Sequence, residues 1–139
     1  MSGTSALGGA QAAFVERARV ARLGTTMLDG TPHVVPVCPV LDLDRIVIAS
    51  GFDRKVANIR DNPAVCIAFD DYSEDWEHGL AQVIVYGDAY LVDSGPEFDR
   101  DAALLNEKFP QYPASTSPIE LGTTVMIEIR IVRVSSSWV

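Results

Sequence analysis

The segment Ser50–Lys55 carries the side chains best suited to chemistry in this sequence. It joins an apolar run, Arg45–Ser50, to the start of a predicted helix, where Arg54 and Lys55 stand side by side. The first turn of a helix exposes unpaired N–H groups and the positive end of the helix dipole, so two cations there favour a bound phosphate group. A solvated Arg-Lys pair is the alternative interpretation. Asp53 precedes the pair, and we expect its carboxylate to cap the helix.

No other segment has the pattern of a nucleophilic, acid-base or metal site. His33 and His78 are the only histidines, lie in or beside turns, and accompany no GxSxG or HExxH motif. The acidic segment Asp70–Glu77 lacks the spacing and central glycine of a calcium loop, which favours a solvated loop. Cys38 and Cys66 fit no CxxC or metal spacing and lie in apolar runs, so we expect buried, reduced thiols. We predict no catalytic side chain and no metal site.

The overall composition argues against several classes of partner. The chain has 139 residues, enough for one domain, and 11 Lys and Arg against 19 Asp and Glu give a net charge of -8. Such an acidic surface repels phosphodiester backbones and anionic lipids, so we expect neither nucleic acid nor a membrane as a partner. The longest apolar stretch, Val34–Leu41, is too short to span a bilayer, and residues 1–9 have no secretory signal pattern. We predict a disordered tail over 1–9, one domain over 10–139 and a cytoplasmic location.

The hydrophobic pattern predicts a mainly β (α+β) fold with peripheral helices. Helical spacing of apolar residues predicts helices over 11–22, 54–61 and about 97–109. Two strands are expected on either side of the Asp29-Gly30 turn, and four more are expected over 45–50, 64–69, 82–92 and 125–131. This order lacks the strand-helix-strand alternation of parallel sheets, so it favours an antiparallel six-stranded barrel. Gly87 predicts a bulge or a close backbone approach within the fifth strand.

Three prolines, Pro32, Pro36 and Pro39, fall in the second strand. Each proline lacks the N–H group that a sheet ladder needs, so this strand must be bulged or partly unpaired. Unpaired main-chain groups there could bind a ring system that carries several hydrogen-bonding atoms. An edge strand is the commoner reason for prolines in a sheet.

Several of these segments together resemble a known superfamily. The runs Thr31–Val40, Ile46–Ser50, Arg54–Val65 and Val83–Ala89 are similar in order and spacing to the pyridoxamine 5'-phosphate oxidase-like split β-barrel proteins, the FMN-binding split-barrel type. Asp75-Trp76 ahead of the long strand, and Trp138 near the end, resemble the actinobacterial branch of coenzyme F420-dependent oxidoreductases. The resemblance extends from Phe14 to Trp138. The chain lacks the basic C-terminal cluster of the pyridoxamine phosphate oxidases, so pyridoxamine phosphate is not expected as its substrate.

The resemblance implies a homodimer with cofactor sites at the subunit interface. By this similarity, Val35, Pro36 and Val37 lie along the isoalloxazine-type ring. The stretch from Ala49 and Ser50 to Lys55 holds the phosphate, with Arg54 and Lys55 as its cations and Asn58 supporting them one turn later. Trp76 and Gln82 are expected to come from the other subunit and close the pocket.

The implied function is hydride transfer from reduced coenzyme F420 to an unsaturated small molecule. An FMN-dependent oxidoreductase on the same fold is the alternative, and a protein that binds a cofactor or haem without turnover is another. Coenzyme F420 has an additional anionic tail, for which Arg22, Arg60 and Lys108 are candidate cations. In this superfamily the cofactor carries the chemistry, which agrees with the absence of a recognisable catalytic triad. The sequence does not identify the substrate.

Overall fold

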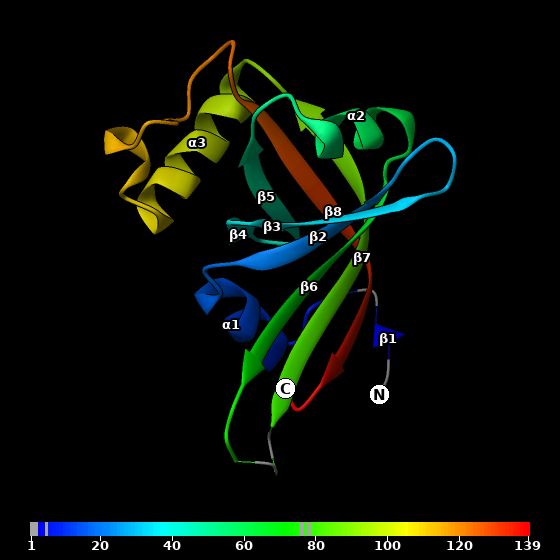
Figure 1. Cartoon of the computed structure of the whole chain (residues 1–139). Coiled ribbons are helices and arrows are strands. Elements are labelled where there is room, and N and C mark those ends of the chain that lie inside the picture. Colours follow the sequence, from blue (N-terminus) through cyan, green and yellow to red (C-terminus); the bar gives the residue numbers. More distant parts are fainter. Residues whose placement is uncertain (1–2, 5, 76, 78) are drawn as a thin grey trace.

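The computed structural model describes residues 3–4, 6–75, 77 and 79–139 and shows a curled antiparallel sheet with three helices around it (Figure 1). The strands are β1 (Gly3–Thr4), β2 (Ala21–Thr26), β3 (Pro32–Val37), β4 (Pro39–Asp42), β5 (Arg45–Ser50), β6 (Ala64–Tyr72), β7 (Leu80–Val92) and β8 (Val125–Ser137). The helices are α1 (Gly9–Arg17), α2 (Arg54–Asp61) and α3 (Pro96–Lys108), followed by the short 3-10 turn η1 (Tyr112–Ala114). The predicted mainly β, antiparallel fold is confirmed.

The strand order explains why the sheet is a split barrel. Neighbouring strands follow the order β3-β2-β6-β7-β8-β5-β4, and β1 pairs with β8. The two edge strands, β3 and β4, are consecutive in the sequence and separated only by Cys38. The two edges of the sheet therefore come together where the chain passes from β3 to β4, so the sheet curls into a half-barrel (Figure 1).

The sheet has more strands than the six expected. The segment predicted as one strand is divided at Cys38 into β3 and β4, because Pro36 and Pro39 cannot donate to a continuous ladder. Both pieces are edge strands, the position in which a sheet tolerates proline. The additional strand β1 consists of Gly3 and Thr4, from the segment predicted to be a tail, and pairs with Ser135 and Val134.

The first helix is shorter than predicted. α1 ends at Arg17, and the last two residues of the expected helix, Ala21 and Arg22, instead begin β2. Ala21, Leu23 and Thr25 are all buried and alternate with less buried neighbours, so the two-residue period of a strand prevails there. α2 has the predicted bounds, and α3 begins at Pro96. No helix among the described residues combines the length and apolar character needed to cross a membrane.

The two longest strands, β7 and β8, are irregular at Gly87. Their register shifts between Tyr86 and Gly87, which is the mark of a β-bulge. A Cβ atom on Gly87 would lie 2.3 Å from the carbonyl oxygen of Arg130. The predicted bulge and the predicted close approach are therefore both present.

Apolar side chains form two clusters, one on each face of the curled sheet. Ile46 and Ile48 of β5 point into the main cluster, which α1 and α2 also enter. Val47, between them, points to the opposite face and packs with Phe98 and Leu105 of α3. α3 is therefore held on the outside of the barrel, as Figure 1 shows.

Candidate functional site

The end of β5 and the start of α2 form the candidate anion site. Asp53 occupies the N-cap position of α2, but its side chain accepts no hydrogen bond from the first turn, so the predicted capping role is wrong. The N–H groups of that turn lack a side-chain acceptor and lie at the positive end of the helix dipole. This end of α2 can therefore accept a phosphate group.

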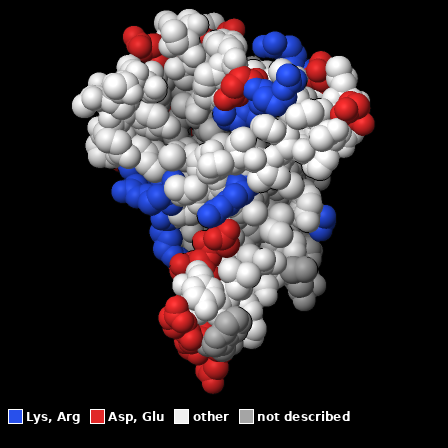
Figure 2. All heavy atoms as spheres, in the orientation of Figure 1, with Lys and Arg blue, Asp and Glu red and all other residues white. Residues whose placement is uncertain are grey.

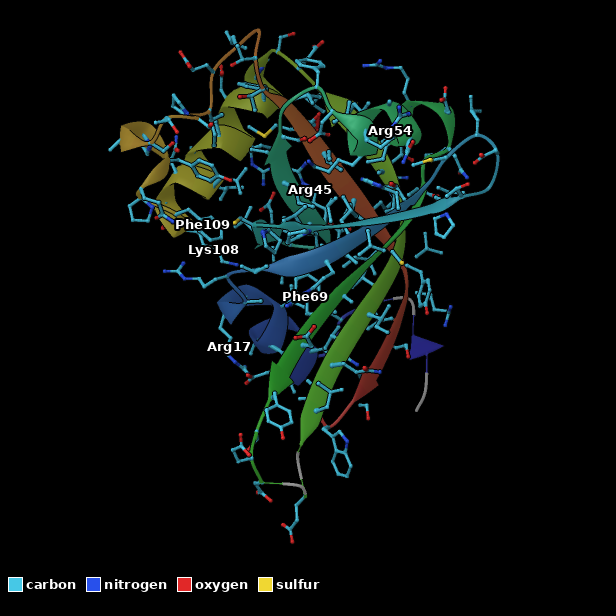
Figure 3. All side chains as sticks on the ribbon, viewed as in Figure 1. Arg17, Arg45, Arg54, Phe69, Lys108 and Phe109 are labelled. Atoms are coloured by element: carbon cyan, nitrogen blue, oxygen red, sulfur yellow. The ribbon has the colours of Figure 1, made fainter. Side chains whose placement is uncertain are left out.

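The two cations at this point differ in environment. Arg54, the first residue of α2, is exposed, and it forms no ion pair with any residue in the described part of the chain (Figure 3). The Lys55 ammonium instead lies 2.6 Å from the Asp53 carboxylate, and its side chain is only 14% exposed. Arg54 can therefore bind an anion directly. Lys55 must first break its ion pair with Asp53 before it can bind the anion.

Asn58 lies in the interior rather than beside the anion site. It is 2% exposed, and its Nδ2 donates a hydrogen bond of 3.0 Å to Oγ1 of Thr25 on β2. The side chain therefore cannot touch a phosphate at the exposed start of α2. Instead, this bond fixes how α2 is rotated against the sheet, which determines where Arg54 and Lys55 point.

Ala49 and Ser50 line a cleft of about 410 Å³ next to the start of α2. The opposite wall comes from the segment between α3 and β8, and Figure 2 shows the surface hollowed between these regions. The lining is rich in hydroxyl groups and contains one carboxylate and no Lys, Arg or His. Its residues are Ala49, Ser50, Gly51, Tyr112, Thr116, Ser117, Pro118, Ile119, Glu120, Thr123 and Thr124.

Two hydroxyl groups in the cleft already have local roles. Ser50 Oγ donates a 2.7 Å hydrogen bond to the Gly51 carbonyl, and Thr124 Oγ1 accepts one of 3.0 Å from the Glu120 N–H. Burial, followed by the neighbouring Cys38, raises the pKa of Tyr112, so its phenol is a hydrogen-bond donor at neutral pH. The cleft therefore has an ordered polar wall. From the sequence, this wall was visible only as a long loop.

The segment Val35–Val37 presents mostly backbone, rather than side chains, to a ligand. Val35 and Val37 point into the main cluster, whereas Pro36 between them is exposed. Because β3 is an edge strand, part of its N–H and C=O groups face away from β2 and have no partner strand. A ring along this segment would meet Pro36 and these main-chain groups.

Gln82 lies far from the anion site within one chain. It belongs to β7 and pairs with Asp70 and Ser137, towards the end of the β6–β7 hairpin that lies opposite α2 in Figure 1. Trp76 falls outside the described residues. The closure of the pocket by these two residues from a second subunit stays a prediction.

The candidate cations for an anionic tail are not gathered at the start of α2. Arg22 pairs with Asp70 at 3.2 Å, and Lys108 Nζ donates a 2.7 Å hydrogen bond to the Pro39 carbonyl. Burial and the nearby Arg19 lower the pKa of Lys108 to about 8. Arg60, at the opposite end of α2 from Arg54, is exposed.

The histidines and cysteines lie partly where the sequence predicts them. Within the described ranges, no group of three or more His, Cys, Asp and Glu side chains could hold a metal ion. His33 is half-buried on β3, and His78 is not among the described residues. Cys38 and Cys66 are free thiols, as expected, but half-buried rather than fully buried.

Comparisons with known proteins agree with this architecture. A search of curated proteins finds no match. Among solved structures, a FAD-binding protein from Mesorhizobium loti is 22% identical, with a TM-score of 0.76 over 98% of this chain and 97% of that one. An F420 reductase is 20% identical, with a TM-score of 0.67 over 96% and 100%. HutZ, the heme storage protein from Vibrio cholerae, is 16% identical, with a TM-score of 0.73 over 86% and 85%.

At these sequence identities, the solved structures establish only that the fold is shared. The family is assigned by the match of the sequence to a family model. The model of the pyridoxamine 5'-phosphate oxidase family matches residues 7–137, nearly the entire chain. The split barrel, its strand order and this match lead to one conclusion: the chain belongs to the pyridoxamine 5'-phosphate oxidase family.

Proposed function

We propose that this protein is an oxidoreductase that binds reduced coenzyme F420. The reaction would be hydride transfer from this cofactor to an unsaturated small-molecule substrate. The observation that carries the proposal is the start of α2, which lies next to a cleft. Its first N–H groups have no side-chain cap, and Arg54 has no ion pair with any described residue. The family match and the structural likeness to an F420 reductase support it. When bound, the deazaflavin would supply the hydride.

The protein's own task is then to bind and orient. Arg54, the first N–H groups of α2 and Lys55, once released from Asp53, would hold the phosphate. The free edge of β3 would lie along the ring through Pro36 and main-chain groups. The cleft behind Ser50 would receive the substrate. A protein that only binds and orients needs no side chain as a proton donor, because the cofactor carries the chemistry.

FMN is the competing cofactor on the same site. Both molecules carry a phosphate and a three-ring system, so the start of α2 would bind either one. The structural neighbours include a FAD-binding protein as well as the F420 reductase. F420 differs from FMN by its anionic tail, which needs additional cations. Two candidates have other partners in the single chain: Arg22 pairs with Asp70, and Lys108 bonds to the Pro39 carbonyl. Cofactor preference is therefore the first property to measure.

A homodimer is part of the proposal. Leu28 and Val34, both in the β2–β3 hairpin, expose 84% and 64% of their surface, and Phe52 beside the anion site exposes 54%. A second copy of the chain packed against this hairpin would bury these apolar side chains, which water surrounds in the single chain. A second copy seated there would also enclose the ring position along β3.

The test is a binding titration of the purified protein with F420 and, separately, FMN, followed by cofactor fluorescence. Lys55→Ala and Arg54→Ala should each weaken binding by about 10- to 150-fold, the value of one charge-assisted hydrogen bond. Arg60→Ala is the matched control, because it removes a cation from the other end of the same helix. Wild-type affinity in both test variants would refute the phosphate site.

The same titration separates the alternatives. Tighter binding of F420 than of FMN supports the proposal, and the reverse order replaces it with an FMN enzyme. Binding of neither, together with a Soret band after addition of haem, would favour a haem-binding protein like the HutZ neighbour. If F420 binds, oxidation of the bound reduced cofactor by an added electron acceptor would demonstrate turnover.

A further inference from the structure

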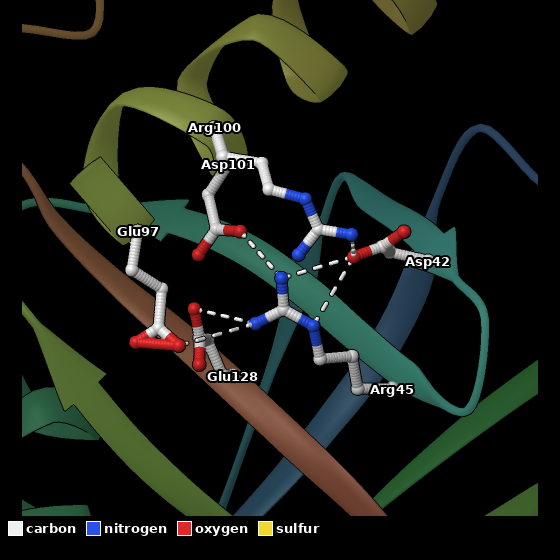
Figure 4. Close-up of polar contacts among 6 residues, drawn as sticks. All are labelled: Asp42, Arg45, Glu97, Arg100, Asp101 and Glu128. Carbon is white, nitrogen blue, oxygen red and sulfur yellow. Dashed lines mark hydrogen bonds and ion pairs between the residues drawn. The ribbon is translucent and has the colours of Figure 1, made fainter.

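A cluster of charged side chains joins α3 to the outside of the barrel (Figure 4). It draws on three strands and one helix, and no part of the proposed function uses it. Its members are Asp42 of β4, Arg45 of β5, Glu128 of β8, and Glu97, Arg100 and Asp101 of α3. The cluster therefore fixes the helix that precedes the cleft wall.

Arg45 is the centre of the cluster. Its Nη2 lies 2.9 Å from Asp42 Oδ2 and 3.0 Å from Asp101 Oδ1. Its Nη1 lies 2.6 Å from Glu128 Oε2. Burial alone would lower the pKa of Arg45, but the contacts with Glu128 and Asp42 outweigh it and raise the pKa, so the guanidinium stays charged. Arg45 thus contacts three carboxylates within 3.0 Å, and a fourth, that of Glu97, at 3.9 Å.

The buried part of the cluster has an excess of negative charge. The side chain of Asp101 is fully buried, and those of Glu128 and Asp42 are 9% and 10% exposed. Arg100, which contacts Asp42 at 2.8 Å, and Glu97, at 3.9 Å from Arg45, are more than half exposed. Buried like charges at close range cannot all stay ionised at low cost.

Two carboxylate oxygens lack the hydrogen bond that a buried oxygen needs. Among the described residues, Asp101 Oδ2 has no hydrogen-bond partner, and it points toward the Glu128 carboxylate (Figure 4). Glu128 Oε2 forms a 2.6 Å ion pair with Arg45, and it too has no hydrogen-bond partner in the described part of the chain. A proton between the two carboxylates would satisfy both oxygens and remove one buried negative charge.

We propose that Asp101 and Glu128 share one proton at neutral pH, and that loss of this proton weakens the attachment of α3 to the barrel. Burial first, and then Glu128, raises the pKa of Asp101 to about 7, while Arg45 acts in the opposite direction. The other charged groups around the pair are Asp42 and the exposed Glu97 and Arg100. A shallow pocket beside them adds Asp44, Tyr90 and Arg130.

The proton has a consequence for the cleft. α3 ends at Lys108, and the next residues along the chain, beginning with η1, form the cleft wall. A looser α3 in mildly alkaline solution would loosen this wall. The cluster is thus a pH-sensitive device that acts on the cleft without touching its ligand.

The sign of the pH effect follows from proton linkage. An aspartate in the unfolded chain has a pKa of about 3.9, so between about pH 4 and 7 the folded state binds one proton more than the unfolded state. Stability is therefore lost as the pH rises through this window and levels off above it. The unfolding constant should rise by up to about tenfold per pH unit.

The experiment compares urea unfolding of the full chain between pH 5 and 9 for the wild type, Asp101→Asn and Asp99→Asn. Asp101→Asn should remove this pH dependence, because the amide is neutral at every pH. Asp99, exposed on the first turn of the same helix, is the matched control and should keep it. Parallel curves for the wild type and Asp101→Asn would overturn the proposal.

A second measurement on the wild type does not depend on any variant folding. Carboxyl carbon NMR should show a buried acid titrating near pH 7, and hydrogen exchange of α3 and residues 111–124, corrected for intrinsic rates, should accelerate above that pH. If every carboxyl group titrates below pH 5, no shared proton exists. Exchange in these segments that does not change with pH would refute the link to the cleft.

Discussion

At the scale of single residues, the most informative side chain is Asp53. The sequence suggests a helix cap, but the carboxylate instead holds the Lys55 ammonium at 2.6 Å and leaves the first turn of α2 uncapped. It thereby competes with any phosphate for Lys55. The Asp53 carboxylate would thus weaken binding at the proposed anion site.

Asp53→Asn should consequently strengthen phosphate and cofactor binding by about two- to fivefold, the scale of an exposed ion pair. The measurement is the dissociation constant of FMN or F420 at low and at high salt, and the gain should shrink as salt increases. Asp61→Asn, at the last residue of α2, controls for the change in net charge. Weaker binding by Asp53→Asn would mean that Asp53 assists the ligand instead.

At the scale of secondary-structure elements, β7 and β8 depend on one glycine. The bulge at Gly87 brings it against the backbone of β8, where the carbonyl oxygen of Arg130 would be 2.3 Å from an added Cβ. Backbone cannot move aside as a flexible side chain can. The element therefore requires glycine at this position for steric reasons.

Gly87→Ala should destabilise the fold by about 1–3 kcal/mol or more, because the strands must separate to admit a methyl group. The free energy of unfolding in urea measures this loss. Gly9→Ala is the control, since nothing lies within 4 Å of its Cβ position and the residue is in α1. Equal stability of the two variants would show that β7 and β8 adjust freely.

At the scale of the whole molecule, the half-barrel leaves its β2–β3 hairpin uncovered. Leu28 and Val34 are both largely exposed, and the proposed ring position along Pro36 lies on β3 together with Val34. A second copy would cover the apolar side chains and complete the site in one step. Assembly and cofactor binding should therefore be coupled.

Val34→Asp should shift the proposed dimer toward monomer and weaken cofactor binding in parallel, because a carboxylate would be buried in the interface. Analytical ultracentrifugation and the fluorescence titration measure the two effects. Leu43→Asp, on the β4–β5 turn and 85% exposed, is the control. A monomeric wild type, or an unchanged dimer in Val34→Asp, would contradict the proposed interface.

Local patterns in the sequence predicted much of this structure. The apolar run 45–50 and the helix 54–61 appear as expected, because each depends on neighbours in the chain. The same holds for Arg54 at a helix start. The bulge at Gly87 was signalled by the glycine itself, although its partner is the distant backbone of β8. The extent of α1 could not be predicted this way. Ala21 and its neighbours fit the spacing of a helix as well as that of a strand, and only the pairing of β2 with β6 selects the strand.

Local sequence patterns encode the fold class, the family resemblance and the position of the proposed anion site at the start of α2. The tertiary structure alone decided the state of that site and of the cluster at Arg45. Lys55 is held by Asp53, Asn58 is turned inward to Thr25, and Asp101 is buried against Glu128. These outcomes depend on residues brought together in space and on their removal from water, and spacing along the chain encodes neither.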